Sequence, residues 1–312
     1  QTLRLLTRLE PKVIRHDGGS AGLNLTRATL DATCKYPWDV ADAPVRPDGR
    51  ENRKFGVYAD DMPVFSWFRQ GAKEAGAEFG QKCMEAMVMD LADDISYSVH
   101  DVEDAVFGGH LQLEDLKDPA KRQHVFEKTR LWYLPNVDDA ALDAALRRLE
   151  SLDRWVPFMS GTRASMAAFK AFTSEVIGRF AATAMEATRA QFGEDRPLTR
   201  YSAQLIVPEE TEHEIAVMKG IATAFVMTVR DAQPHYDNQQ EILGVLVEAL
   251  LENPDYLEPV FRADIRELGH NDDTARLRLV IDQVASLTDR SAVTLYRRIT
   301  GNHWVLGDKP LW

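Results

Sequence analysis

A chain of 312 residues is long enough for one large domain or two ordinary ones, each with a sizeable core. A formal net charge of −12 argues against nonspecific affinity for a nucleic-acid backbone, so we expect a nucleic acid only as a regulator. Two cysteines form neither a zinc pattern nor a disulfide framework, and no apolar run approaches the length of a membrane span. These features predict a cytoplasmic protein with reduced thiols and no membrane partner.

The first part of the chain predicts short helices joined by a long connection. Residues 1–10 have helical periodicity, and residues 24–36 predict a second helix with Asn24 as its N-cap. Residues 37–63 are rich in proline and charge and predict an irregular connection, a type of loop that is often functional in compact domains. A further helix begins within residues 64–72.

Residues 81–106 predict one helix that carries more acidic residues than solubility requires. Apolar residues recur at helical spacing, so one side can face a core. Asp93, Tyr97 and Asp101 are spaced i, i+4, i+8 and therefore share one edge of the helix. Such an edge can hold a metal at one end and a hydroxylated ligand along the rest. A solvated acidic face explains the same spacing.

The remaining chain keeps helical periodicity nearly throughout. Ser160 or Thr162 is suited to cap the longest of these helices. Residues 197–210 are the only extended candidate and predict a short strand or hairpin. The fold class is therefore all-α, with at most a minor β hairpin. The expected helices cover residues 113–132, 138–155, 160–192, 208–227, 241–254, 256–268 and 275–300.

Three groups with metal-ligand residue types have simpler explanations. His16-Asp17 precedes two glycines and is typical of a turn, with Asp17 the turn former. His100 is adjacent to Asp101, but successive helical residues diverge by about 100°, so His100 is expected on a helix face. Glu210, His213 and Glu214 fall at a helix start, where acidic residues are favoured by the helix dipole.

Two lysines on separate segments could converge on a triphosphate. Lys35 and Tyr36 lie at the end of the second expected helix, and Lys54 lies on a separate segment. Lys35 also suits the C-terminal end of a helix as a favourable cation, and Lys54 suits an ordinary surface position. The residues alone leave both interpretations open.

Two long motifs carry a family resemblance. Residues 88–106, VMDLADDISYSVHDVEDAV, and residues 24–38, NLTRATLDATCKYPW, resemble the bacterial deoxyguanosinetriphosphate triphosphohydrolase family of the HD-domain superfamily. Residues 1–9 and 280–299 are similar to further helices of that family. The resemblance implies an HD-domain-like helical bundle with additional C-terminal helices. Residues 1–110 would form the C-terminal part of the HD catalytic core, and residues 111–312 a helical C-terminal region.

The resemblance also implies an activity and a cofactor. Members of that family hydrolyse deoxynucleoside triphosphates, dGTP among them, to the deoxynucleoside and inorganic tripolyphosphate, with water activated by a divalent metal such as Mg or Mn. Asp93 resembles a metal ligand of the HD site. Tyr97 and Asp101 resemble residues that contact the deoxyribose, and Lys35, Tyr36 and Lys54 resemble residues that face the sugar and phosphates. A homo-oligomer and a nucleotide effector are further expectations from the family.

The match departs from the family pattern at one place. The family takes a histidine and a His-Asp pair from helices that precede the motif matched by residues 1–9, so we expect the catalytic residues and the other metal ligands upstream of Gln1. On this expectation the chain lacks part of the active site. A non-catalytic nucleotide-binding regulator on the same scaffold is the first alternative, and a structural helical protein with a solvated acidic strip is the second.

Overall fold

The computed structural model describes residues 1–45, 49, 51–227, 233–268 and 272–301. The chain divides into two compact units, Gln1–Thr228 and Val229–Trp312. Across the described residues, helices account for the regular structure, and the β pairing consists of one isolated antiparallel bridge between Ile14 and Ser20. The all-α prediction is therefore confirmed. The expected division at residue 110 falls inside the first unit and stays a prediction about which residues carry the catalytic core.

The first unit begins with short helical elements around a small core. They are α1 (Thr2–Arg4), the π-helical turn η1 (Leu5–Leu9), α2 (Arg27–Ala32), the 3-10 turn η2 (Ala59–Asp61) and α3 (Met62–Glu74). Their buried side chains include Leu3, Leu30, Cys34, Val57 and Phe68.

The prediction of an Asn24 cap on a helix over 24–36 is wrong in its boundaries. The hydroxyl of Thr26 accepts the Thr29 N–H and caps α2, whereas Asn24 has a φ of 52° in the left-handed region. Asparagine tolerates that conformation because its short polar side chain can hydrogen-bond locally, so it serves a turn before the helix.

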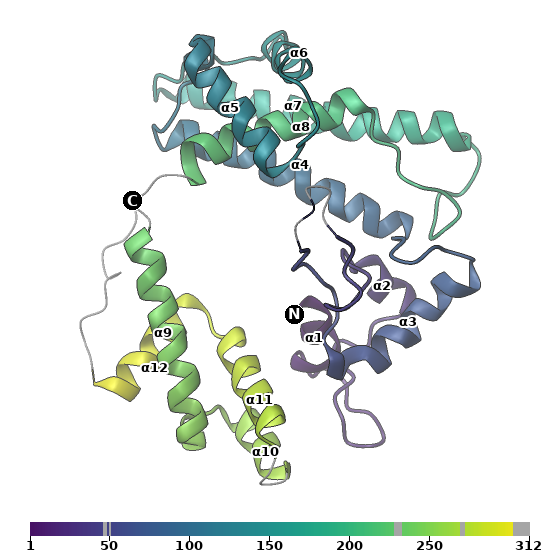
Figure 1. Ribbon diagram of the computed structural model, residues 1–312, viewed down its shortest axis with the longest axis vertical. Helices are drawn as coiled ribbons and strands as arrows, with labels where there is room; N and C mark the ends of the chain where they lie inside the picture. The colour runs from purple at the N-terminus through teal and green to yellow at the C-terminus, as the bar shows by residue number, and fades with distance from the viewer. Residues whose placement is uncertain (46–48, 50, 228–232, 269–271, 302–312) are drawn as a thin grey trace. The chain divides into compact units, whose positions relative to one another are not determined.

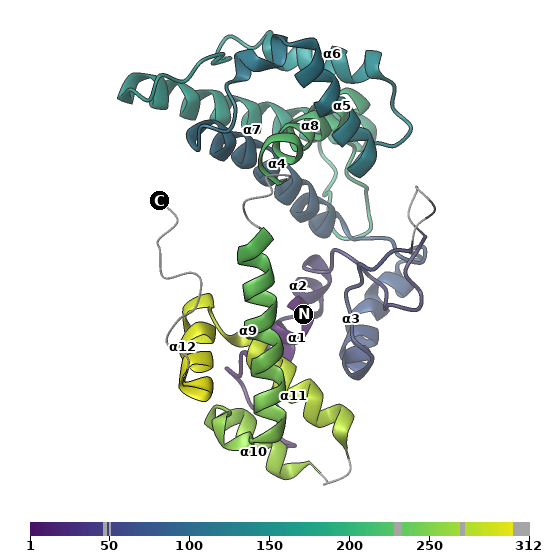
Figure 2. The same ribbon diagram turned by 60° about the vertical axis from the view of Figure 1, so that its left-hand side comes forward.

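The long acidic helix is the central element of the first unit. It is α4 (Met84–Phe107), and it packs against α7 (Arg163–Phe192) and α8 (Glu209–Ala222). From there it extends toward α2, as both Figure 1 and Figure 2 show. The helix predicted over 81–106 is thus confirmed, and so is the Thr162 cap of the helix predicted over 160–192. The α4 helix connects the main core to the segment that carries Lys35.

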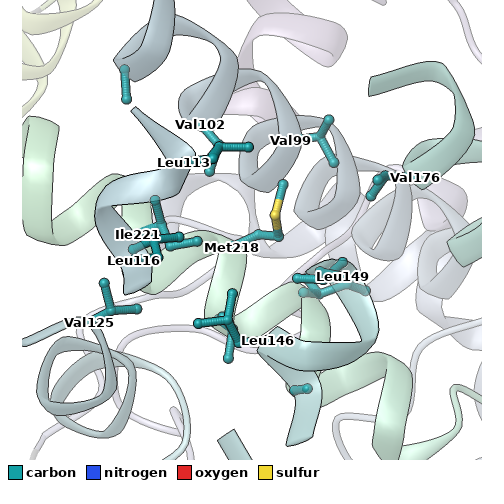
Figure 3. Close-up of a cluster of buried hydrophobic side chains, with 14 of the residues drawn as sticks. Val99, Val102, Leu113, Leu116, Val125, Leu146, Leu149, Val176, Met218 and Ile221 are labelled. Atoms are coloured by element: carbon teal, nitrogen blue, oxygen red, sulfur yellow. The ribbon is translucent and has the colours of Figure 1, made fainter. Parts of the chain in front are cut away.

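The other helices of the first unit complete one hydrophobic core. They are α5 (Pro119–Trp132) and α6 (Asp139–Glu150), with the 3-10 turn η3 (Leu113–Lys117) before them and the π-helical turn η4 (Thr223–Met227) after α8. Figure 3 shows Met218 of α8 surrounded by side chains from α4, η3 and α6. All of these side chains are almost completely buried: Val99, Val102, Leu113, Leu146, Leu149 and Met218. The apolar side of α4 is therefore fixed in this core, which leaves its acidic edge at the surface.

The second unit is a separate group of helices. It contains α9 (Gln233–Glu252), the 3-10 turn η6 (Pro254–Tyr256), α10 (Pro259–Glu267), α11 (Asp273–Ser286) and α12 (Asp289–Thr300). The α9 helix packs on α11 and α12, and Leu246 and Tyr296 are part of its core. The single helix predicted over 275–300 is wrong, because Thr288 interrupts it and caps α12 by accepting the Ser291 N–H.

Two further expectations concern extended and membrane-spanning segments. Residues 197–208 connect α7 to α8 without forming a strand, so the prediction of a strand or hairpin there is wrong. Ile206 N–H instead donates to the hydroxyl of Thr188 on α7, and this bond ties the connection to the helix. In the described part of the chain, no helix is both long and apolar enough to cross a membrane.

Candidate functional site

Lys35 lies between two carboxylates of α4. Its ammonium nitrogen is 2.7 Å from Oδ1 of Asp90 and 2.8 Å from Oδ2 of Asp93. Partial burial opposes the charged form of Lys35, but hydrogen bonds to both carboxylates outweigh it and raise the lysine pKa. The chain leaves α2 at Ala32 and buries Cys34, which directs Lys35 toward α4. The fold therefore brings Lys35 into direct contact with the Asp93 edge of α4.

Asp90 is a member of this group that the sequence motifs did not indicate. It binds Lys82 as well as Lys35. Burial disfavours its charge, yet the hydrogen bonds to the two lysines lower the pKa of Asp90. Asp90 precedes Asp93 by three residues, so the same helical spacing that grouped Asp93 with Tyr97 also puts Asp90 near that edge. That spacing is the signal that could have identified it.

Tyr36 and Lys54 also meet. The Lys54 ammonium lies over the Tyr36 ring, 5.8 Å from its centroid, and the indole N–H of Trp38 donates to the Lys54 carbonyl at 2.8 Å. A close backbone approach allows this arrangement, because a Cβ on Gly56 would lie 2.1 Å from the Tyr36 carbonyl oxygen. The long connection thus returns to the segment after α2, where Lys54 lies beside Tyr36.

Tyr97 and Asp101 continue along the edge of α4 that begins at Asp93. The Tyr97 side chain is 63% exposed, and Asp101 is partly buried. Burial, and then the neighbouring charge of Asp104, raise the pKa of Asp101. Among the described residues, no hydrogen bond, ion pair or ring contact joins Tyr97 or Asp101 to Lys35 or Lys54. The fold therefore pairs Lys35 with Asp93 and Lys54 with Tyr36, and it leaves Tyr97 and Asp101 without a contact to either lysine.

A buried ionic cluster holds this region in place. Asp31 on α2 is 1% exposed and accepts hydrogen bonds from Arg69 on α3 at 2.8 Å and from the Tyr201 hydroxyl at 2.6 Å. Arg200 also pairs with Asp31 and contacts Glu85 at the start of α4. The cluster joins α2, α3, α4 and the segment before α8, so it positions Lys35 against α4. No local sequence pattern predicts this cluster, because its members are far apart in the chain.

The metal site expected from the family stays a prediction. In the described residues, no group of three or more histidine, cysteine, aspartate or glutamate side chains could hold a metal ion. Asp93 is partly exposed and could offer one carboxylate, but its Oδ2 is already bound to Lys35. These residues do not make a metal site on their own. The weaker candidates are also accounted for, since Glu214 is buried between Arg148 and Arg179, and His100 binds Glu103 at 3.1 Å.

The predicted turn at His16-Asp17 is confirmed. The carboxylate of Asp17 accepts the Gly19 N–H at 2.9 Å and the Arg15 guanidinium at 3.2 Å. The Gly19 hydrogen bond, followed by Arg15, lowers the pKa of Asp17. The Asp17 carboxylate therefore stabilises the turn, which is a common role of aspartate in turns.

A hollow lies next to the α4 carboxylates. It has a volume of about 460 Å³, and its lining includes Asp90 and Asp94 of α4, Lys219 of α8, and Tyr133 after α5. Lys219 is 2.8 Å from Asp94 and lies over the Tyr133 ring. Asp90 therefore belongs both to the Lys35 group and to the wall of this hollow.

Comparison with known proteins matches nearly the whole chain. A model of the phosphohydrolase-associated domain matches residues 205–298. A protein of Bifidobacterium longum named deoxyguanosinetriphosphate triphosphohydrolase-like is 47% identical, over 95% of this chain and 62% of the relative's length. A protein of the same name in Streptomyces coelicolor is also 47% identical, over 97% of this chain and 69% of the relative's length. The relative in Corynebacterium efficiens is 38% identical over 98% of this chain and 70% of its own length. The chain thus spans 62 to 70% of the length of these relatives. It belongs to the family of deoxyguanosinetriphosphate triphosphohydrolase-like proteins.

Proposed function

We propose that this protein hydrolyses deoxynucleoside triphosphates, dGTP among them, to the deoxynucleoside and inorganic tripolyphosphate. The observation that carries the proposal is the position of Lys35 between Asp90 and Asp93, with Lys54 over the ring of Tyr36, the next residue in the chain. The chain also belongs to a family named for a triphosphohydrolase, and this supports the same reaction. A group of cations next to an acidic helix edge suits a substrate that carries phosphates at one end and a hydroxylated sugar at the other.

Lys35 and Lys54 are assigned to the phosphates. An ammonium group has three N–H donors, and the carboxylates of Asp90 and Asp93 engage two of those of Lys35. The remaining donor can bind a phosphate oxygen while the two carboxylates hold the side chain in place. Lys54 is exposed and held over Tyr36, so it can add a second positive charge without rearrangement of the backbone.

Tyr97 and Asp101 are assigned to the deoxyribose. On an ideal helix they lie about 6 Å and about 12 Å along the axis from Asp93. The exposed Tyr97 ring can pack on the sugar face, where a 2′-hydroxyl would collide with it, and the Asp101 carboxylate can accept a hydrogen bond from the 3′-hydroxyl. This division of roles accounts for selection of deoxyribonucleotides over ribonucleotides.

The proposal includes a divalent metal such as Mg or Mn, which would supply an activated water. Asp93 is the one residue of this chain assigned to it, because the described residues contain no group of three or more histidine, cysteine, aspartate or glutamate side chains that could hold a metal. The Lys35 contact holds the Asp93 carboxylate at the end of the sugar-binding edge. A homo-oligomer, a nucleotide effector and a cytoplasmic location also belong to the proposal, since each follows from the family resemblance and the composition.

The experiment that tests the proposal identifies the products. The purified full-length protein, with the segment that the family pattern predicts upstream of Gln1, is incubated with dGTP in the presence of Mg or Mn, and ³¹P NMR follows the phosphorus compounds. A tripolyphosphate signal that grows as deoxyguanosine accumulates is the expected result. Release of orthophosphate or pyrophosphate would contradict it, and tight binding of dGTP without turnover would favour the non-catalytic regulator.

A further inference from the structure

The roles assigned along α4 run in one direction. Asp93 is assigned to the metal, and Tyr97 and Asp101, one and two turns toward the C-terminal end, are assigned to the deoxyribose. A deoxynucleoside triphosphate has its sugar on one side of the α-phosphate and its β- and γ-phosphates on the other. The two distal phosphates therefore extend from Asp93 toward Asp90, in the direction of the N-terminal end of α4.

The hollow next to the α4 carboxylates lies on that side of Asp93. The α4 residues in its lining fall between Met87 and Asp94 and include Asp90, whereas Asp93 does not line it. Its volume of about 460 Å³ is in the range of sites for small-molecule ligands. A ligand that begins at Lys35 and passes Asp90 therefore enters this hollow.

Lys82 lines the hollow and shares a carboxylate with Lys35. Asp90 binds Lys35 through Oδ1, at 2.7 Å, and Lys82 through Oδ2. Because both ammonium groups contact the same carboxylate, they are close enough to bind oxygens of neighbouring phosphates. The Lys82 side chain is 24% exposed, so a ligand in the hollow can reach it.

Lys219 enters the same hollow from α8. Its ammonium nitrogen is 2.8 Å from Oδ1 of Asp94 and 5.5 Å from the centroid of the Tyr133 ring. The side chain is 19% exposed. An ammonium group has three N–H donors, so the bond to Asp94 leaves donors for a ligand. Lys82 and Lys219 thus give the hollow two accessible phosphate-binding groups.

The charges of the hollow accommodate an anion. Asp90 is shared by two lysines, and Asp94 is paired with Lys219. Glu212 also lines the hollow and opposes an anion, and burial raises the pKa of its carboxyl. Lys35, Lys82 and Lys219 together balance these three carboxylates. A phosphate that enters the hollow therefore meets charge-assisted donors without a net negative field.

We propose that this hollow receives the β- and γ-phosphates of the substrate, with Lys82 and Lys219 as phosphate-binding residues. The inference rests on the proposed hydrolysis and adds two residues to its site. After hydrolysis the same residues hold the tripolyphosphate, so inorganic tripolyphosphate should bind the protein and compete with dGTP.

Isothermal titration calorimetry of the full-length protein with inorganic tripolyphosphate tests the site without turnover. The buffer contains no added divalent metal, because tripolyphosphate chelates such ions. Orthophosphate is the matched probe, since one phosphate cannot span both lysines. We expect saturable binding of tripolyphosphate and an affinity at least about tenfold weaker for orthophosphate. Equal affinity for the two probes, or no binding of tripolyphosphate at about 1 mM, would overturn the assignment.

Two substitutions tie the binding to the hollow. Lys82→Gln and Lys219→Gln each remove one charged donor, so each should weaken tripolyphosphate about tenfold and raise KM for dGTP by a similar factor. Deoxyguanosine has no phosphate and should keep its wild-type affinity, which a general effect on the fold would change. The control Lys117→Gln removes an exposed lysine of η3 that does not line the hollow, and it should bind tripolyphosphate as wild type does.

The two proposals fail in different experiments. Wild-type protein that binds tripolyphosphate through these lysines but does not turn over dGTP would contradict the hydrolysis and support the phosphate site. Wild-type tripolyphosphate affinity in folded Lys82→Gln and Lys219→Gln would overturn the phosphate site, even if dGTP is hydrolysed. If Lys219→Gln lacks the wild-type circular dichroism spectrum, Lys82→Gln alone decides.

Discussion

The Lys35 ammonium lies 2.8 Å from the Asp93 carboxylate, and this pair joins the segment after α2 to the exposed edge of α4. The two residues are separated by the long proline-rich connection and by α3, yet the fold brings them into direct contact. The contact argues against a purely solvated acidic strip, because at least one end of that strip is tied to a cation on another segment.

Substitution of Lys35 by glutamine should weaken substrate binding. The variant loses one cation for the phosphates and leaves Asp90 and Asp93 without their shared partner, so we expect KM for dGTP to rise about tenfold or more. Stability should change by less than about 1 kcal/mol, because the pair is partly exposed. Steady-state kinetics beside thermal unfolding separate the two effects. Lys73→Gln, an exposed lysine on α3, is the matched control, and an unchanged KM in Lys35→Gln would remove Lys35 from the site.

Replacement of Tyr97 by alanine should loosen the discrimination between dGTP and GTP. The side chain is 63% exposed, so its removal is expected to change the free energy of unfolding by no more than about 0.5 kcal/mol. A functional effect can then be read without interference from instability. The ratio of kcat/KM for dGTP to kcat/KM for GTP should fall about tenfold. If that ratio is the same in Tyr97→Ala and wild type, Tyr97 does not contact the sugar.

Asp31→Asn should destabilise the first unit strongly. The substitution removes the charge that Arg69 and Arg200 share in a buried cluster, and loss of one partner from such a cluster costs about 3 kcal/mol. Urea unfolding monitored by circular dichroism measures this change. Glu74→Gln, an exposed carboxylate on α3, should leave the midpoint unchanged. A midpoint for Asp31→Asn equal to that of wild type would show that the cluster does not stabilise the fold.

The two thiols should react slowly in the folded protein. Because their pKa values are raised by folding, the free energy of unfolding should fall at alkaline pH. Burial raises the pKa of Cys34 from 9.0 to about 12 and the pKa of Cys83 from 9.0 to about 11. The folded state therefore keeps thiol protons that the unfolded chain releases. Their contribution to stability is fully present below pH 9 and is lost as the pH rises from about 9 toward 11 and 12.

Two measurements check the thiol prediction. A thiol-specific chromogenic reagent at pH 8 should react slowly with the native protein and rapidly after denaturation. The free energy of unfolding should decline between pH 9 and pH 11, and the decline should be shallower in Cys34→Ala. Rapid reaction of both thiols in the native state would contradict their burial.

The helices and the core could largely be predicted from the sequence, because a 3.6-residue period of apolar side chains is a strong local signal. The residues 84–107 helix and the Thr162 cap are examples. Residues 197–210 misled the prediction, because their apolar and β-branched residues suit a strand but find no partner strand among the described residues. Thr288 carried an N-cap signal that continuous periodicity across residues 275–300 concealed.

The site itself was predictable only where its residues share one helix or one motif. Asp93, Tyr97 and Asp101 follow from spacing, and Lys35 from the motif that contains it. The contacts Lys35–Asp90 and Lys54–Tyr36, and the Asp31 cluster, depend on how distant segments meet, which no local pattern encodes. Tertiary contacts of this kind require the fold.

The measurement that tests the central claim most directly is tripolyphosphate release from dGTP by Asp93→Ala and wild type, both as the full-length protein, followed by ³¹P NMR at saturating substrate. Glu186→Gln, an exposed carboxylate on α7, is the control and should retain wild-type release. Because Asp93 anchors Lys35 and is the one assigned metal ligand, its loss should lower the rate at least about a hundredfold, or about 3 kcal/mol in the barrier. A rate for Asp93→Ala equal to that of wild type would contradict the account.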